Sequence, residues 1–447
     1  MLRRKLRDIL FLCCLASAGL ALKAAAENPN QGSWDPVEGR KLAVKAVGDC
    51  GEGRVEACRA GLLAALARQH GHLEFLQFLA SAEERLGHGP AALAALAEIH
   101  RRGFDLTFDP PDEWVARVAT RPEYQQLLQE TAALRAARVH SSEAFRLPDR
   151  ELIPEGIAYD PKTGAFFVGS VRQRRIVRRS AQGELRDFVP AASGDLWSVL
   201  GMTVDPARRH LWVTTTAYPQ MVGFEERLAG RSALLCFDLD SGQRLGRYEA
   251  TTPGGKGFND VRVAPDGAVF VTDHEERPGT LYRLDPKTRQ LAPFGPADAL
   301  GSPEGLTFSS DGRYLFVADY SYGIVRFELA TGQVLYLEDP LATTLIGLDH
   351  LEFYRGDLIA IQNGNRPHSV VRLHLAADLG SISGFEILEQ RHPGYSDPTL
   401  GTLVGDELYF VANSQWGRFD AKFQLPPADQ LQEPLILRLP LGGETKP

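Results

Sequence analysis

The chain has 447 residues, of which 44% are hydrophobic and 24% are charged. This is the composition of an ordinary globular protein, and the length allows two or three domains. The formal net charge is −8, so nucleic acid and anionic membrane surfaces are poor partners for this protein.

The first 26 residues have the pattern of a signal peptide. Basic residues at positions 3, 4, 5 and 7 precede an apolar stretch at 9–22, and three alanines at 24–26 offer a cleavage site. An uncleaved membrane anchor is the alternative, but the stretch is short for spanning a bilayer. We predict that residues 1–26 are removed on export to the periplasm or the exterior. The mature chain then has 44 basic and 56 acidic residues, a net charge of −12, and no membrane span.

Residues 27–37 are predicted to be a linker, and residues 38–140 a domain of α-helical hairpins rich in Ala, Leu, Arg and Glu. At 72–104, apolar residues recur at helical spacing on both sides of a break at 87–90. The small residues Ala80, Gly87 and Ala92 give this hairpin a resemblance to a tetratricopeptide repeat, and a plain helical bundle is the equal alternative. Either structure would allow the domain to dock a protein partner.

Three cysteines remain after the predicted cleavage. Cys50 and Cys58 are close in sequence, and an oxidising compartment would permit a disulfide between them. Two buried thiols are the alternative. Cys236 lies in a predicted strand, so we expect it in the core.

Residues 143–447 change to short strands separated by Gly, Asp and Pro turns, and they contain an internal repeat. Copies of a strand–turn–strand unit occur at 154–170, 200–216, 257–273, 303–319, 348–363 and 398–413. Six such copies, most followed by a third strand, predict an all-β six-bladed propeller. The strand at 143–148 precedes the first copy, so we expect it to complete the sixth blade and close the ring.

The residue before the innermost strand of each blade should lie at the mouth of the central channel. Aligning the copies places Glu155, Leu200, Asn259, Glu304, Asp349 and Thr399 at this position. Four of the six offer oxygen ligands, and the three carboxylates among them should repel one another unless they share a cation. Hard oxygen ligands favour Ca²⁺, with Mg²⁺ or Mn²⁺ as alternatives. For any one residue, capping of backbone N–H groups is the competing interpretation.

The sequences around these positions resemble those of the senescence marker protein-30, gluconolactonase and luciferin-regenerating enzyme family. The segment PEGIAYD is similar to the family's first-blade motif, which implies that Glu155 is a metal ligand. FNDVRVAPDG is similar to its third-blade segment, which implies that Asn259 contacts substrate near the metal. GLDHLEF stands where the family has a metal-binding aspartate that is the proposed catalytic base, here Asp349.

Two departures from the family pattern affect the site. The fourth-blade motif is usually Pro-Asn-Gly, whereas here Glu304 replaces the asparagine and adds a negative charge. Some family members carry a substrate-binding arginine at the position of Gly257, for which Lys256 is the nearest substitute. These departures put the metal preference, and the presence of a metal, in question.

Further candidates for substrate contacts follow the inner two strands. His350 follows Asp349, and Asn363, Asn413 and Trp416 follow second strands of blades five and six. Trp416 offers a face on which a sugar ring can stack, and the amides offer hydrogen bonds to hydroxyl groups. Turn formation is the competing interpretation for the asparagines.

The resemblance implies an exported, metal-dependent hydrolase of lactones, sugar acids or related esters, with Asp349 as the base. The alternative is a non-catalytic propeller that binds a ligand at the mouth and a protein partner through the helical domain. A third possibility is a related propeller that uses Glu304 as a base without a metal.

Overall fold

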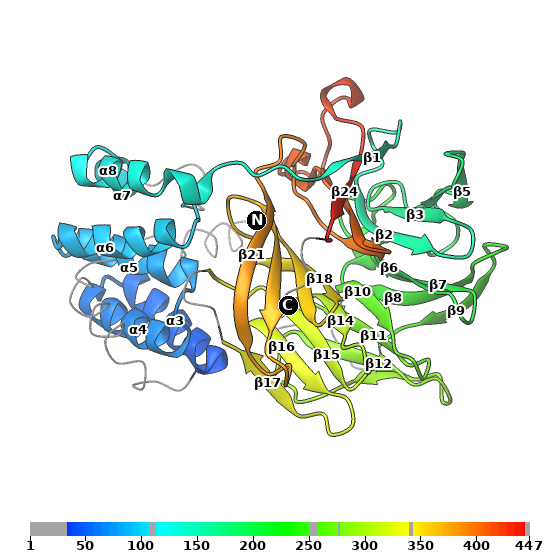
Figure 1. The fold of residues 1–447 in the computed structure, drawn as a ribbon, viewed down its shortest axis with the longest axis horizontal. Helices are drawn as coiled ribbons and strands as arrows, with labels where there is room; N and C mark the ends of the chain where they lie inside the picture. The colour runs from blue at the N-terminus through cyan, green and yellow to red at the C-terminus, as the bar shows by residue number, and fades with distance from the viewer. Residues whose placement is uncertain (1–33, 107–112, 251–256, 276–277, 339–342, 443–447) are drawn as a thin grey trace.

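The computed structural model describes residues 34–106, 113–250, 257–275, 278–338 and 343–442, which form a helical layer beside a ring of β-sheets (Figure 1). The predicted signal peptide lies outside the described residues. Within the described ranges, no helix is both long and apolar enough to span a bilayer.

The helices of the described chain occupy its N-terminal part. They are α3 (Pro36–Gly51), α4 (Val55–Arg68), α5 (Leu73–Arg85), α6 (Gly89–Arg101), α7 (Glu113–Ala119) and α8 (Pro122–Glu130). The predicted hairpin is the pair α5 and α6, and it bends where Gly87 takes a positive φ of 77°. Leu79 and Leu96 are fully buried between the helices. Cys50 and Cys58 form a disulfide that joins α3 to the start of α4.

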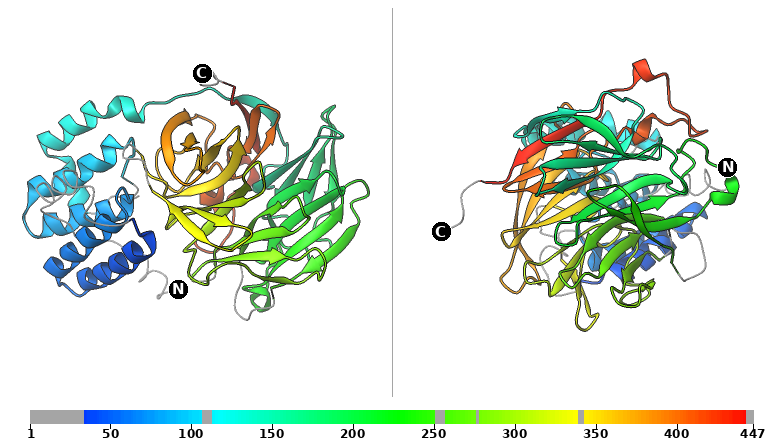
Figure 2. Two further views of the ribbon diagram at one scale, coloured as in Figure 1. Left: turned by 60° about the horizontal axis from the view of Figure 1, so that its bottom comes forward. Right: turned by 90° about the vertical axis from the view of Figure 1, so that its right-hand side faces the viewer.

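Six four-stranded sheets follow, arranged as a ring (Figure 2). Blade 1 contains β2 (Pro154–Asp160), β3 (Ala165–Ser170), β4 (Ile176–Arg179) and β5 (Leu185–Val189). Blade 2 contains β6 (Ser198–Asp205), β7 (His210–Thr216), β8 (Ser232–Asp238) and β9 (Arg244–Tyr248). Blade 3 contains β10 (Phe258–Val263), β11 (Val269–Asp273), β12 (Thr280–Leu284) and β13 (Leu291–Pro293).

Blade 4 contains β14 (Pro303–Phe308), β15 (Tyr314–Asp319), β16 (Gly323–Glu328) and β17 (Val334–Leu337). Blade 5 contains β18 (Leu348–Tyr354), β19 (Asp357–Gln362), β20 (Ser369–Leu375) and β21 (Ile382–Gln390). Blade 6 contains β22 (Gly401–Val404), β23 (Glu407–Val411), β24 (Leu435–Pro440) and, as its outer strand, β1 (Ser142–Arg146). The prediction that the first strand closes the ring is therefore confirmed.

The innermost strand of most blades contains an irregularity at the predicted mouth residue. In blade 1, Pro154 pairs with Ser170 but the next partner is Ile157, so Glu155 lies in a bulge. The same shift occurs beside Leu200, Asn259, Glu304 and Asp349. A bulge turns a side chain out of the regular alternation of a strand. The repeated bulge therefore directs the mouth side chains of blades 1 to 5 towards the channel.

Glycines beside two of the mouth residues let neighbouring blades approach closely. A Cβ on Gly156 would lie 2.1 Å from the backbone oxygen of Leu200, and one on Gly305 would lie 2.7 Å from that of Asp349. Any larger residue would push the inner strands apart. The Pro-Glu-Gly sequences are thus strand starts that narrow the channel, rather than turns.

The helical layer is joined to blades 4 and 5 by polar contacts. The Gln69 side chain donates to the backbone oxygen of Ser321 at 2.9 Å, and the backbone N–H of Asp105 donates to that of Arg366 at 2.7 Å. The segment leading into β1 then pairs with the edge of blade 5, where Arg138 and Gln390 form an antiparallel bridge. The contacts fix the helical layer at the outside of the ring, away from the channel (Figures 1 and 2).

Glu389 holds the segment that leads into the closing strand, and its removal should destabilise the protein. Its fully buried carboxylate accepts hydrogen bonds from the backbone N–H groups of His140 and Ser141, the Ser141 hydroxyl and the Tyr395 hydroxyl. Because Glu389→Ala leaves these donors without an acceptor, we expect the free energy of unfolding to fall by about 3 kcal/mol. Urea denaturation measures this change.

The matched control is Glu386→Ala. Glu386 lies on the same strand, but its side chain is 54% exposed. Its Oε2 comes no closer than 4.0 Å to Nη1 of Arg372. We expect this variant to stay within about 0.5 kcal/mol of the original protein. Equal losses in both variants would contradict the role assigned to Glu389.

Candidate functional site

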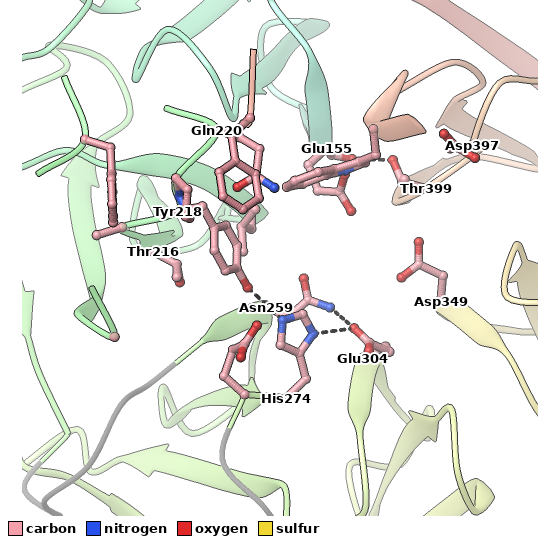
Figure 3. A pocket seen from close by; sticks show the side chains of 18 of the residues that line it. Glu155, Thr216, Tyr218, Gln220, Asn259, His274, Glu304, Asp349, Asp397 and Thr399 are labelled. Carbon is pink, nitrogen blue, oxygen red and sulfur yellow. Dashed lines mark hydrogen bonds and ion pairs between the residues drawn. The ribbon is translucent and has the colours of Figure 1, made fainter. Parts of the chain in front are cut away.

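A cavity of about 1020 Å³ opens at the end of the channel where the mouth residues lie (Figure 3). Eight of the residues singled out from the sequence line it: Glu155, Leu200, Asn259, Glu304, Asp349, Asn363, Thr399 and Trp416. The three carboxyl groups come from blades 1, 4 and 5, and their residues are only 6%, 5% and 4% exposed. Burial of several carboxyl groups in one cavity is costly unless protons or donors compensate their charges.

Glu155 is held by groups from blade 6. The indole N–H of Trp416 donates to its Oε2, and the Thr399 hydroxyl donates to its backbone oxygen at 2.9 Å. Burial raises the pKa of Glu155 to about 8, repulsion from Glu304 adds to the rise, and the Trp416 hydrogen bond opposes it. At neutral pH this carboxyl group therefore holds its proton for most of the time.

Glu304 is paired with blade 3. Its Oε2 accepts a hydrogen bond from the side-chain amide of Asn259 and lies 3.0 Å from Nδ1 of His274. Burial lowers the pKa of His274, but the charge of Glu304 and the hydrogen bond to it outweigh that effect and raise the pKa to about 9. Glu304 and His274 therefore form a buried ion pair at neutral pH.

Asp349 is oriented by its own blade. Asn363 donates from Nδ2 to Asp349 Oδ2 at 2.6 Å, and the Tyr320 hydroxyl donates to the oxygen of the same amide. Burial raises the pKa of Asp349 well above its usual range, and the charges of Glu155 and Glu304 add to the rise. Asp349 and Glu155 thus titrate as a pair, and the two cannot both be ionised at low cost.

The site does not fit the divalent cation predicted from the sequence. No group of three or more His, Cys, Asp or Glu side chains in the described ranges is arranged to hold a metal ion. Asn259 turns its amide N–H groups, rather than its oxygen, towards Glu304. The imidazolium of His274 already supplies a positive charge to that carboxylate.

Two candidates from the sequence lie away from the cavity. His350 is not among its lining residues; its ring is 1% exposed, with Nε2 3.5 Å from Glu352. The side chain of Asn413 bonds to the backbone oxygen of Glu433 and the backbone N–H of Leu435. The prediction that these two residues bind substrate at the mouth is therefore corrected. The alternation of strand β18 turns His350 away from the cavity, and the contacts with residues 433 and 435 hold Asn413 outside it. Lys256 lies outside the described residues.

Sequence reasoning gave too little weight to three cavity residues: Tyr218, His274 and Tyr320. His274 and Tyr320 directly follow the second strand of their blades, as Asn363 does. The second-strand ends that identified Asn363 in blade 5 would have identified both residues if blades 3 and 4 had been given equal weight. Tyr218 follows its strand by two residues and contacts Nε2 of His274 at 2.7 Å.

Residues 153–336 match the family model of the SMP-30/Gluconolactonase/LRE-like region. The resemblance inferred from the motifs is thereby confirmed for these residues. A search of curated proteins finds no match to the chain.

Similar solved structures include a gluconolactonase from Xanthomonas campestris, with 20% identity, coverage of 68% of this chain and 99% of that chain, and a TM-score of 0.45. The calcium-binding protein regucalcin from Agrobacterium tumefaciens has 18% identity, covers 66% and 93%, and has a TM-score of 0.45. Virginiamycin B lyase from Staphylococcus aureus has 15% identity, covers 62% and 83%, and has a TM-score of 0.43.

The raised pKa of Glu155 predicts a pH-dependent stability. Between the ordinary value of 4.5 and about 8, the native protein holds a proton on Glu155 that the unfolded chain has lost. Stability due to this group is therefore complete below the lower value and falls as the pH rises, by up to about 1.4 kcal/mol per pH unit. We expect Glu155→Gln to flatten the fall between about pH 5 and pH 8.

Urea denaturation at a series of pH values, with EDTA present to remove divalent ions, measures the slopes. Glu386→Gln, on the exposed face of blade 5, is the control and should keep the original slope. A slope unchanged by Glu155→Gln would contradict the burial of a protonated carboxyl group at this position.

Proposed function

We propose that this SMP-30/Gluconolactonase/LRE-like propeller hydrolyses lactones or related esters in the cavity around Glu155, Glu304 and Asp349. The observation that carries the proposal is that Glu155 and Asp349 are buried carboxyl groups lining one cavity, where burial raises the pKa of both and the charge of Glu155 raises that of Asp349 further. Such a pair supplies one group that takes a proton and one that gives a proton, as acyl hydrolysis requires.

Asp349 is the base in this mechanism. The mechanism uses the state of the coupled pair in which Glu155 holds its proton and Asp349 is ionised. The Asp349 carboxylate removes a proton from a water molecule, whose oxygen attacks the carbonyl carbon of the substrate. Asn363, which donates to Asp349 Oδ2 at 2.6 Å, keeps the carboxylate in one orientation. Burial and the charges of Glu155 and Glu304 raise the pKa of Asp349, which makes its carboxylate a stronger base.

Glu155 is the acid. When the tetrahedral intermediate collapses, the bond between the carbonyl carbon and the ester oxygen breaks, and the Glu155 carboxyl group protonates the departing oxygen. Trp416 Nε1–H then stabilises the carboxylate that remains. The proton gained by Asp349 and the proton lost by Glu155 balance, so exchange with solvent restores the starting state.

No step is assigned to a divalent cation, because the arrangement around Glu304 does not fit one. The sequence resemblance implied a dependence on calcium, and titration with divalent ions decides between that expectation and this assignment. Because His274 neutralises Glu304, we expect Ca²⁺ and Mn²⁺ to leave the melting temperature unchanged. A rise that grows with the ion concentration would show binding to the native state and would contradict this assignment.

We also propose that the protein is exported. The signal-peptide pattern of residues 1–26 supports this proposal, as does the disulfide between Cys50 and Cys58, since such bonds persist in oxidising compartments. N-terminal sequencing of the protein from the extracytoplasmic fraction would test it. A chain that retains residues 1–26 in the cytoplasm would contradict it.

Replacement of the base should abolish most of the activity. We expect Asp349→Asn to fold and to lower kcat for lactone hydrolysis by about 10²- to 10⁴-fold, because the amide cannot accept a proton from water. A pH-stat assay with a panel of lactones and esters measures the rate. Asp357→Asn, at the far end of the adjacent strand β19 and 23% exposed, should retain the original rate.

An unchanged rate in Asp349→Asn would contradict the assignment of the base. If the original protein opens no lactone and cleaves no ester in the panel, the proposed hydrolysis is wrong. Saturable binding of panel compounds without turnover would then favour the non-catalytic binding propeller.

A further inference from the structure

Three side chains from different blades form a continuous chain at one side of the cavity (Figure 3). Glu304 Oε2, from blade 4, lies 3.0 Å from Nδ1 of His274, which follows β11 of blade 3. Nε2 of the same ring lies 2.7 Å from the Tyr218 hydroxyl, which follows β7 of blade 2. A carboxylate, an imidazole and a hydroxyl joined in this order form a catalytic arrangement that is identified by geometry rather than by sequence position.

The position of the His274 imidazole depends on a glycine in the same blade. A Cβ on Gly257 would lie 2.2 Å from Cγ of Glu275 and 3.2 Å from Cδ2 of His274. Only glycine at this position leaves room for the His274–Glu275 segment to lie over the start of β10. Gly257 and Glu304 are the two departures from the family pattern, and both are in contact with this segment.

The phenol lies beside the groups assigned to catalysis. Tyr218 lines the cavity together with Glu155 and Asp349, and its ring meets the edge of Trp416 with centroids 6.1 Å apart. Trp416 in turn donates to Glu155. Burial is the main cause that raises the pKa of Tyr218 well above its usual range, so its hydroxyl keeps its proton.

We propose that Tyr218 is a further catalytic residue, which donates a hydrogen bond to the carbonyl oxygen of the substrate, and that Glu304 and His274 position it. The inference rests on the proposed hydrolysis. When both ring nitrogens carry hydrogen, His274 donates from Nδ1 to Glu304 and from Nε2 to the Tyr218 oxygen, which leaves the phenolic hydrogen to point into the cavity. When water attacks, negative charge develops on the carbonyl oxygen of the substrate, which accepts this hydrogen bond.

The role explains how the site polarises a carbonyl group. The hydrogen bond strengthens as the tetrahedral intermediate forms and weakens when the carbonyl double bond returns. No proton leaves the chain in this step, since the proton from water goes to Asp349 and the proton for the departing oxygen comes from Glu155. Tyr218 supplies electrostatic stabilisation, and the other two groups hold its hydroxyl in place.

Steady-state kinetics of Tyr218→Phe tests the inference. We expect kcat for lactone hydrolysis to fall by about 10²- to 10³-fold with KM changed little, because the lost interaction forms mainly in the transition state. His274→Gln should lower kcat in the same direction, since it removes the charged donor behind the phenol. In the double variant the effects should not add, because both act on one hydrogen bond.

Matched controls come from blade 5. His374 Nδ1 lies 2.9 Å from Asp357 Oδ2, with the imidazole 24% exposed, close to the 23% of His274. The Tyr354 hydroxyl donates to Asp406 at 2.7 Å, outside the cavity. His374→Gln and Tyr354→Phe should therefore keep the original kcat.

Proton NMR tests the Glu304–His274–Tyr218 arrangement independently of hydrolysis. The N–H proton of His274 that is donated to Glu304 should give a strongly deshielded proton NMR signal. This signal should persist in Asp349→Asn and in the blade 5 controls, and it should be lost in His274→Gln. Its absence from the original protein would overturn the inference.

The kinetic outcomes are distinct. A protein that hydrolyses lactones while Tyr218→Phe retains kcat within about twofold overturns the role of Tyr218 and leaves the proposed function intact. A protein that shows the NMR signal and hydrolyses nothing overturns the proposed function, and the catalytic role of Tyr218 fails with it. If Tyr218→Phe does not fold, His274→Gln decides the question through the same split between kcat and KM.

Discussion

The site depends on the cost of placing three carboxyl groups in one buried cavity. Glu155, Glu304 and Asp349 come from three blades, and the bulge at the start of each inner strand turns them towards the same space. Burial and mutual repulsion disfavour three negative charges there. The structure meets this cost in two ways, since Glu304 is paired with an imidazolium and the other two carboxyl groups titrate together.

Each carboxyl group has a different set of nitrogen donors, which gives the three groups different chemistry. An indole meets Glu155, an imidazole and an amide meet Glu304, and an amide meets Asp349. Because an imidazolium pairs with one carboxyl group and burial favours protonation of the other two, similar side chains can act as anchor, acid and base. The propeller supplies this variety because the second strands of blades 2 to 5 end at the rim of the cavity.

The repeat in the sequence was sufficient to predict the six blades and the closing strand, because each copy repeats the alternation of a strand and the turn that follows it. It also located Glu155, Glu304 and Asp349, since equivalent positions of a ring must converge on its axis. The roles of neighbouring side chains were harder to predict. His274 follows its mouth residue by 15 positions, and only the folded blade brings it to Glu304.

The metal prediction illustrates the same limit. Three converging carboxylates indicate a nearby positive charge, but the sequence does not say whether a metal ion or a side chain supplies it. The pairing of Glu304 with His274 depends on the space left by Gly257 and on the direction of the loop after β11. Such three-dimensional details were not visible in the spacing of the motifs.

The central claim is that Glu155 and Asp349 are not both ionised at neutral pH, so that at least one of them holds a proton. Infrared difference spectroscopy tests this claim most directly. The spectrum of the native protein minus that of the double variant Glu155→Gln, Asp349→Asn, recorded at neutral pH with EDTA, isolates these two groups. The account predicts the C=O stretching band of a protonated carboxyl group in the native protein. A difference spectrum that contains only bands of ionised carboxylates would contradict it.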